Sequence, residues 1–200
     1  MITDTVTEQV VLLTESGESA GVTPKATVHT TETPLHLAFS CYLFNTDGQL
    51  LLTRRALAKP TWPGVWTNSC CGHPAPGESL SDAVARRLQR ELGITVPEVT
   101  LVLPRFRYRA VMTNGMVENE MCPVFRAFTD SNVTDASPAP DEVDDAQWVD
   151  WTSLVDEVLA GRRAISPWCL DQITELATLP ADPRDWPIGD PADLPPAARS

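Results

Sequence analysis

The sequence has no long apolar run and no basic, apolar start. Its uninterrupted apolar stretches are far shorter than the roughly 20 residues that a membrane-spanning helix needs, and the opening MITDTVTEQV lacks the charged and hydrophobic parts of a signal peptide. With 200 residues, 42% of them hydrophobic, and no long charged block, the chain can bury one substantial core. These features predict one globular domain in the cytoplasm, with no membrane partner.

Cysteine is scarce and irregularly placed. The five cysteines are an odd number, two of them are adjacent in TNSCCGHPA (67–75), and no C-x-x-C pair is present. This spacing argues against a disulfide framework and a zinc ribbon, and adjacent cysteines would close a strained ring on oxidation. We expect free thiols, one in an active loop and one buried. Cys71, directly before Gly72, has the less crowded neighbour, and a nearby histidine or helix N-terminus can tune its acidity.

Positive charge is also scarce and unevenly distributed. The formal net charge of −12 disfavours nucleic acid as a partner, because its phosphates would be repelled. The first 24 residues hold no Lys or Arg, whereas nine of the 15 Lys and Arg residues fall between Arg54 and Arg109, and the segment from Asp130 to Glu157 is strongly acidic. A basic middle on an acidic chain suits a small anionic ligand, although each charge taken singly also fits a solvated surface.

Apolar periodicity and turn signals predict a mixed sheet with a few helices. One β-hairpin is expected with its turn at NTDG (45–48), and another, FRYRAVM with MVENEMCPVFRAF, with its turn at Asn114 and Gly115. Residues 79–90 have apolar side chains four apart before Gly93, which is typical of an amphipathic helix. Further elements are expected as strands at 10–13 and 145–151 and as helices at 151–161 and 169–178. This pattern indicates an α/β or α+β domain.

The end of the chain has a different composition. Six prolines occur in the 21 residues from Pro180 onward, and proline disfavours regular elements. We therefore expect one domain over residues 1–180 and a Pro-rich tail over residues 181–200 that is extended or disordered and forms no ordered element.

Two glutamates and three histidines are candidates for a metal site. On a strand, Glu118 and Glu120 of VENEMCP point to one face, because side chains alternate. The apolar run CPVF follows, and carboxylates on a buried strand need partners such as a divalent cation, although an exposed acidic face has the same pattern. The chain has only three histidines, His29, His36 and His73. Together these five side chains would make a site suited to Mn²⁺, Zn²⁺ or Fe²⁺.

The segment that begins at Gly72 resembles the Nudix box, a loop–helix–loop whose carboxylates hold the divalent cation of a diphosphate. The marked positions that agree are Gly72, Glu78, Arg86, Leu88, Glu91, Gly93 and Ile94. Two positions depart, because Arg87 and Arg90 stand where the box has acidic residues. The exchange reduces the carboxylate cluster that drives diphosphate hydrolysis and adds cationic contacts for phosphate oxygens.

TNSCCGHP, the altered box, FRYRA and VENEMCPVF together resemble the type I isopentenyl-diphosphate isomerases, a Nudix-fold family without net hydrolysis. The resemblance spans Lys25 to Trp168. It implies a mixed sheet sandwiched by helices, an isoprenoid diphosphate as substrate, and a monomer or weak homodimer with no nucleic acid partner. The family interconverts isopentenyl and dimethylallyl diphosphate by adding a proton to a double bond and removing one from the neighbouring carbon.

The resemblance also implies roles for individual residues. Cys71 and Glu120 match the acid–base groups on opposite faces of the substrate, with Tyr108 as a helper. The first metal site, for Mn²⁺, Zn²⁺ or Mg²⁺, matches His29, His36, His73, Glu118 and Glu120. Mg²⁺ carried by the diphosphate would meet Glu91 and the backbone carbonyl of Cys71. The substrate-binding residues are Lys25, Arg55, Lys59 and Arg87 for the diphosphate, and Trp168 for the carbocation.

From the sequence alone, two alternative functions and one geometric conflict at Tyr108 remain open. A Nudix pyrophosphohydrolase would release phosphate or a nucleoside monophosphate, and a non-catalytic Nudix-like module would bind a diphosphate without turnover. A two-residue turn at Asn114 and Gly115 would pair Tyr108 with Met121 and send its ring to the face away from Glu120. The implied role of Tyr108 therefore requires a longer loop or a bulge.

Overall fold

The computed structural model describes residues 8–130 and 138–199. Most of the opening segment MITDTVTEQV and residues 131–137 of the acidic segment lie outside the described residues. Among the described residues, no helix has both the length and the apolar character that crossing a membrane requires.

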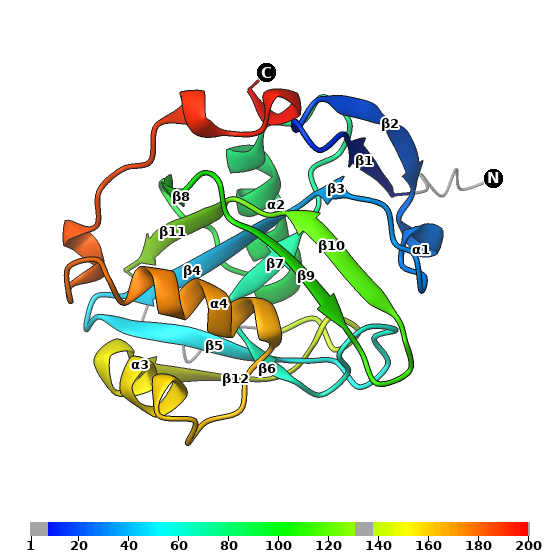
Figure 1. Cartoon of the computed structure of the whole chain (residues 1–200). Helices are drawn as coiled ribbons and strands as arrows, with labels where there is room; N and C mark the ends of the chain where they lie inside the picture. Colours follow the sequence, from blue (N-terminus) through cyan, green and yellow to red (C-terminus); the bar gives the residue numbers. More distant parts are fainter. Residues whose placement is uncertain (1–7, 131–137, 200) are drawn as a thin grey trace, which may run out of the picture.

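Two mixed β-sheets form the centre of the molecule (Figure 1). The first sheet has the strand order β2 (Ser19–Pro24), β1 (Gln9–Leu13), β3 (His36–Leu37), β10 (Val117–Met121) and β9 (Arg107–Val111). The second has the order β12 (Val143–Asp150), β5 (Gln49–Arg55), β4 (Phe39–Asn45), β11 (Val124–Thr129) and β8 (Val99–Leu103), with β6 (Trp66–Thr67) paired to β5 and β7 (Cys70–Gly72) paired to β4. Each sheet contains one parallel pair, β3 with β10 and β4 with β11, among antiparallel neighbours.

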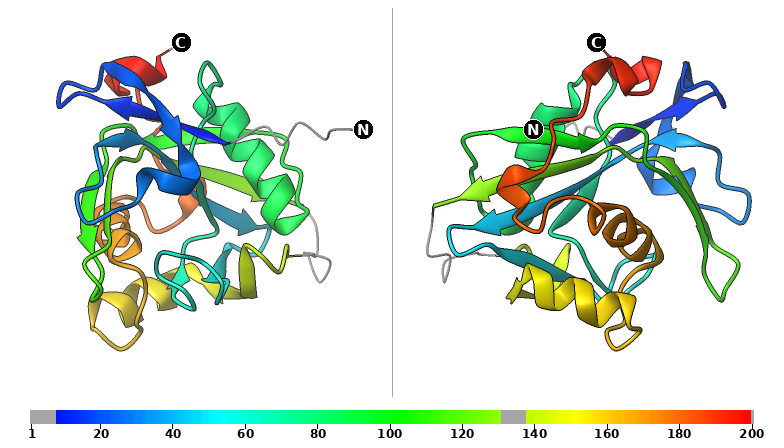
Figure 2. Two further views of the ribbon diagram at one scale, coloured as in Figure 1. Left: turned by 90° about the vertical axis from the view of Figure 1, so that its right-hand side faces the viewer. Right: turned by 60° about the vertical axis from the view of Figure 1, so that its left-hand side comes forward.

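Helices cover both faces of the second sheet (Figures 1 and 2). Helix α2 (Leu80–Leu92) packs on one face, and α3 (Trp151–Leu159) and α4 (Pro167–Leu176) pack on the other. The short helix α1 (Lys25–Val28) follows β2 beside the first sheet. The predicted α+β architecture, with a mixed sheet between helices, is confirmed.

Strand β4 shows why the core has two halves. Phe39 and Leu43 point into the cluster that α2 closes, whereas Tyr42 and Phe44 point into the cluster that α3 and α4 close. All four side chains are fully buried. A strand covered on both faces has apolar residues on both, and for this reason HLAFSCYLF has an almost continuous apolar run.

Local signals set the bounds of α2. Ser79 caps the helix by accepting a hydrogen bond from the Asp82 backbone N–H, and Gly93 ends it in the left-handed conformation with φ of 69°. The apolar stripe is buried at Leu80, Ala83, Val84, Leu88 and Leu92. The helix predicted over 79–90 is therefore confirmed, and it fixes the position of the altered Nudix box.

The β9–β10 hairpin differs from the two-residue turn that was predicted. The Met112 backbone N–H donates to Met116 O, so the loop has three residues, and Gly115 adopts the positive φ of 85° that its closing position requires. This register pairs Tyr108 with Glu120. The longer loop that the role of Tyr108 requires is present, and the ring lies on the face of Glu120.

The predicted strand MVENEMCPVFRAF is two strands in different sheets. Strand β10 ends at Met121 in the first sheet, and β11 begins at Val124 in the second. Pro123 has no N–H to donate to a ladder, so the chain leaves one sheet and enters the other there. This crossing places Glu120 next to the boundary between the sheets.

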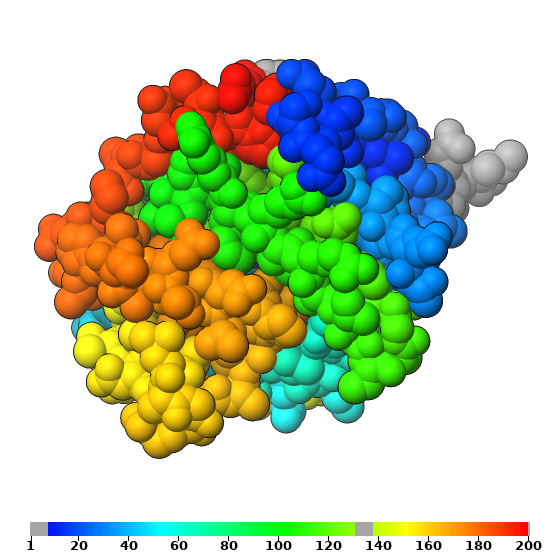
Figure 3. All heavy atoms as spheres, viewed as in Figure 1, coloured from blue at the N-terminus to red at the C-terminus, as the bar shows by residue number. Residues whose placement is uncertain are grey.

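The C-terminal segment has more order than its proline content predicts. It forms three short 3₁₀ helices, η1 (Pro183–Asp185), η2 (Pro191–Asp193) and η3 (Pro196–Ala198), each beginning with a proline, whose fixed φ suits that position. Trp186 and Leu194 are buried, and the Ala197 N–H donates to Gly17 O. At the surface the end of the chain lies against the β1–β2 hairpin (Figure 3). The expectation of no ordered element is wrong because these apolar anchors tie the segment to the body. The division at residue 180 stays a prediction.

Candidate active site

One cavity of about 450 Å³ gathers most of the side chains that the sequence pointed to. The predicted site residues that line it are Lys25, His29, Arg55, Lys59, Cys71, His73, Arg87, Tyr108, Glu118, Glu120 and Trp168. Cys71 comes from β7 in the second sheet, and Glu120 comes from β10 in the first. His36 and Glu91 are buried behind the lining rather than part of it.

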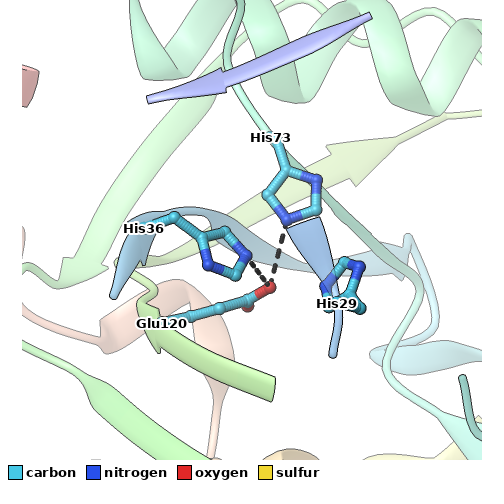
Figure 4. A group of neighbouring side chains, drawn as sticks. All are labelled: His29, His36, His73 and Glu120. Atoms are coloured by element: carbon cyan, nitrogen blue, oxygen red, sulfur yellow. Dashed lines mark hydrogen bonds and ion pairs between the residues drawn. The ribbon is translucent and has the colours of Figure 1, made fainter. Parts of the chain in front are cut away.

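Three strands of the first sheet place three polar side chains in one row. Glu120 of β10 is paired with Tyr108 of β9 on one side and with His36 of β3 on the other. His73 follows β7, and His29 follows α1. These elements bring His29, His36, His73 and Glu120 around one point, with all four ligand atoms within 4.8 Å of one another (Figure 4).

The donor atoms of this group fit a divalent metal. Glu120 Oε1 lies 3.1 Å from His73 Nε2 and 3.2 Å from His36 Nε2 (Figure 4). His36 Nδ1 lies 2.9 Å from Pro34 O, a contact that holds the ring with Nδ1 as donor and Nε2 free to bind a metal. Among the described residues, the buried His29 Nε2 has no hydrogen-bond partner, and the buried His36 Nε2 has none besides its 3.2 Å contact with Glu120 Oε1. Buried polar atoms are rarely left unpaired unless a ligand serves them.

Burial keeps two of these imidazoles neutral. It lowers the pKa of His29 and of His73 to about 4, and the nearby Glu120 opposes that effect only in part. For His36, burial lowers the pKa, but the Glu120 carboxylate outweighs it and the pKa is raised. Burial would raise the pKa of Glu120, but the two histidines hold it well below its usual range. For His29, His73 and Glu120 these are the forms that metal binding requires, namely neutral imidazoles and an ionised carboxylate.

Glu118 stands apart from the metal-binding group. Its Oε2 lies 2.6 Å from the Tyr108 hydroxyl, which also lies 2.8 Å from Glu120 Oε2. Burial and the neighbouring Glu120 charge raise the pKa of Glu118. Tyr108 thus joins the two carboxyl groups, and Glu118 is not among the four residues whose ligand atoms converge.

The two adjacent cysteines point in opposite directions. Cys70 is buried in the cluster beneath α2, whereas Cys71 lines the cavity. The Cys71 thiol donates to Asn68 Oδ1 at 3.1 Å, and its Sγ lies 3.3 Å from Ser40 Oγ. Burial raises the pKa of Cys71 to about 11, although the Ser40 and Asn68 contacts act in the opposite direction. The thiol is therefore protonated in the absence of substrate.

Trp168 forms an aromatic wall of the cavity. It follows Pro167 in the first turn of α4, is 1% exposed, and donates from Nε1 to Asn68 Oδ1 at 3.3 Å. The Trp62 ring meets it edge-on at 5.4 Å, and the Arg55 guanidinium lies 5.5 Å from its centre. The ring is packed against other aromatic side chains, and the Arg55 guanidinium is placed for a cation–π contact with it.

Three cations of the cavity are paired with carboxylates, whereas Arg55 donates to Thr61. Arg87 contacts Glu91 and lies 3.3 Å from Glu142 Oε1, and Lys59 contacts the other oxygen of Glu142. Lys25 Nζ lies 2.7 Å from Glu8 Oε2. Of the two box positions with reversed charge, Arg87 is buried at the cavity, but Arg90 is exposed and pairs with Glu8. The cationic contact expected from Arg90 is thus not at the cavity.

The sequence alone does not mark several polar residues of the site. They are Ser40 and Asn68 beside the thiol, Gln172 behind Ser40, and Glu142 between the cations. A serine in the apolar run HLAFSCYLF was a usable signal, because a buried strand seldom holds a hydroxyl without a partner. Glu142 stands among other acidic residues, and nothing in that pattern distinguishes it.

Comparison with known proteins identifies the fold family. The NUDIX domain family model matches residues 34–169. DR0079 from Deinococcus radiodurans superposes with a TM-score of 0.63 at 19% identity, over 84% of this chain and 98% of that one. The MutT protein from Methanosarcina mazei Go1 gives a TM-score of 0.57 at 22% identity, over 72% and 94% of the two chains. The domain match covers most of the chain, which therefore belongs to the Nudix family.

Relatives with higher sequence identity show to which group within the Nudix family the chain belongs. A protein of Saccharopolyspora erythraea named isopentenyl-diphosphate Delta-isomerase is 63% identical over 191 residues, which are 96% of this chain and 97% of that protein. A protein of Rhizobium rhizogenes with the same name is 50% identical, over 96% of this chain and 91% of its own length. Within the Nudix family, the chain belongs to the isopentenyl-diphosphate Delta-isomerases, and the resemblance stated from its motifs is confirmed.

Proposed function

We propose that the chain interconverts isopentenyl diphosphate and dimethylallyl diphosphate, with Cys71 and Glu120 as the two proton-transfer groups. The observation that carries this proposal is that a thiol from one sheet and a carboxylate from the other line the same cavity, beside a cluster of cations. A shift of a double bond requires a donor and an acceptor at different carbon atoms, and the two sheets supply one group each.

The proposed reaction moves one double bond and conserves every atom. One group donates a proton to the terminal carbon of the double bond, and a tertiary carbocation forms. The other group takes a proton from the neighbouring carbon, whose C–H electrons become the new double bond. In the reverse direction the roles exchange. The Tyr108 hydroxyl, close to both Glu118 and Glu120, supports a proton path that leads from Glu120 to a second carboxyl group.

The carbocation needs protection from water and a source of negative charge. Trp168 can supply a π-face, and the Glu120 and Glu118 carboxyl groups supply oxygen atoms on the cavity wall. All three side chains are largely buried. A cavity in which only fixed groups surround the cation favours proton loss over capture by water.

The metal-binding group belongs to the same proposal. The family implies a divalent metal, and we propose Mn²⁺, with Zn²⁺ and Mg²⁺ as alternatives, for His29, His36, His73 and Glu120, with Glu118 as a further ligand if its side chain turns. The metal would supply positive charge that sets the orientation and acidity of Glu120. Mg²⁺ accompanying the diphosphate is proposed for Glu91 and the Cys71 carbonyl, because Glu91 is a buried carboxylate at the cation cluster, where its Oε1 contacts Arg87.

Isomerisation should depend on metal and release no phosphate. We expect the purified protein to convert isopentenyl diphosphate into its isomer, to lose activity in a chelator, and to regain it with Mn²⁺ and Mg²⁺ added back. Proton NMR of the product mixture, with a phosphate assay in parallel, measures both reactions. Phosphate release without the dimethylallyl product would instead support the pyrophosphohydrolase, and tight binding without any product would support the non-catalytic module.

Lys59→Met should weaken substrate binding more than catalysis. Lys59 is proposed, with Lys25, Arg55 and Arg87, to bind the diphosphate, and a charge-assisted hydrogen bond contributes about 1.5–3 kcal/mol. We expect KM for isopentenyl diphosphate to rise about tenfold or more, with a smaller change in kcat, in steady-state kinetics. Arg105→Met is the matched control, because Arg105 is exposed and pairs only with Asp193 among the described residues. An unchanged KM for Lys59→Met would exclude this contact.

The cellular compartment and the oligomeric state of the protein are also proposals. We infer a cytoplasmic protein that is a monomer or weak homodimer. All five cysteines are free thiols, which supports a reducing compartment.

A further inference from the structure

A chain of buried polar side chains connects α4 with the Cys71 thiol. The Tyr42 hydroxyl donates to Gln172 Oε1 at 3.0 Å, and Gln172 Nε2 donates to Ser40 Oγ at 2.9 Å. Ser40 Oγ in turn lies 3.3 Å from Cys71 Sγ. Tyr42, Gln172 and Ser40 are fully buried, so these hydrogen bonds are not exchanged for bonds to solvent.

The Gln172 amide sets the donor and acceptor roles of its two neighbours in this chain. Tyr42 has one hydroxyl hydrogen and gives it to Gln172 Oε1, so the amide must present its N–H to Ser40. Ser40 accepts that N–H and keeps its own hydrogen for a sulfur atom. Two sulfur atoms are in reach, Cys71 Sγ at 3.3 Å and Cys122 Sγ at 3.4 Å. The Ser40 hydroxyl is therefore a donor that faces the two thiols.

Asn68 fixes the other side of Cys71. Its Nδ2 donates to the backbone carbonyls of Cys41 and Cys70, at 3.1 and 2.8 Å, so Oδ1 is the atom that faces Cys71. Asn68 Oδ1 accepts from the Cys71 thiol at 3.1 Å. The sulfur thus has an acceptor on one side and a donor on the other. An acceptor suits the S–H form, and a donor stabilises negative charge on sulfur.

We propose that Ser40 and Gln172 are positioning residues for Cys71: Gln172 orients the Ser40 hydroxyl, and that hydroxyl donates to the sulfur while Asn68 holds its opposite side. A thiol that gives and takes a proton in turn needs a partner for each form, and this pair supplies both without a movement of the sulfur. The inference rests on the proposed function for the use of Cys71 in isomerisation, but the hydrogen-bond chain itself can be tested by thiol chemistry alone.

The test compares Ser40→Ala and Gln172→Met with the unaltered protein. Iodoacetamide reacts with thiolate, so its reaction rate at one pH reports how well the site stabilises negative charge on sulfur. We expect alkylation of Cys71 to be about fivefold slower in both variants, with Cys71→Ala as the blank for the four remaining cysteines. In isomerisation we expect kcat to fall about tenfold with KM nearly unchanged. Thermal unfolding verifies that each variant is folded.

Ser69→Ala is the matched control. Ser69 is also a fully buried serine, but its hydroxyl accepts from the Leu43 N–H at 2.8 Å and donates to the Leu51 carbonyl at 2.6 Å, away from the Cys71 sulfur and the Asn68 side chain. A general loosening of the core would expose the thiol and speed its alkylation, which is the opposite of the expected change. Alkylation that is unchanged or faster in folded Ser40→Ala would overturn the proposal. If the unaltered protein does not isomerise its substrate, the proposed function fails, and the alkylation result still decides the hydrogen-bond chain.

Discussion

Replacing Cys71 with alanine should lower kcat for isomerisation by about 10³-fold or more. The Cys71 thiol is the proposed proton-transfer group from the second sheet, and removing a positioned acid–base group typically costs 10²- to 10⁴-fold. No other cysteine lines the cavity among the described residues, so no other thiol can replace it. The measurement is the rate of formation of dimethylallyl diphosphate, with KM determined alongside to separate catalysis from binding.

Cys70→Ala provides the control for this prediction. Cys70 has the same chemistry and the adjacent position, but its side chain is buried beneath α2. Its loss should lower the free energy of unfolding by about 1 kcal/mol and leave the isomerisation rate within about twofold. If Cys71→Ala retains activity, or if the two variants lose the same fraction of it, a thiol on this strand is not the acid–base group.

The fold could be predicted where the signals are local, and it could not be predicted where distant segments decide it. The cap at Ser79, the apolar spacing and Gly93 all lie within one helix, and the helix was expected accordingly. Strand β7 has three residues and exists because Cys71 pairs with Ser40, 31 positions earlier, so no local pattern marks it. The same limit explains why residues after Pro180 were not expected to form ordered elements, since Trp186 is ordered by Phe44 and Trp151.

The residues of the site also differ in whether the sequence alone marks them. Only three histidines are present, and their role could be proposed from that scarcity and from a family motif. The supporting residues carry no such mark, because their partners are far away in the chain. Lys59 meets Glu142 across 83 positions, and Gln172 meets Ser40 across 132. A glutamine on an amphipathic helix is typical of a solvent-facing position, and only packing against β4 makes this one part of the site.

Replacing Glu120 with glutamine should remove both metal binding and catalysis. Glu120 contributes the carboxylate of the metal-binding group, and its Oε1 lies close to two histidines while its Oε2 lies 2.8 Å from the Tyr108 hydroxyl. The amide has nearly the same size, but it has no charge for a divalent cation and cannot accept a proton from the substrate. We expect kcat to fall about 10³-fold or more and the Mn²⁺ retained after dialysis to fall severalfold, as measured by elemental analysis.

Glu175→Gln makes the same chemical change at an exposed position on α4, away from the cavity, and should leave the metal content and the rate of isomerisation unaltered. The comparison matters because three histidines could hold a metal without Glu120. Retained Mn²⁺ together with lost activity would mean that Glu120 acts on the substrate but is not needed as a ligand. Full activity in Glu120→Gln would contradict the proposed mechanism, because among the described residues Glu120 is the carboxylate whose oxygen converges with the three histidines.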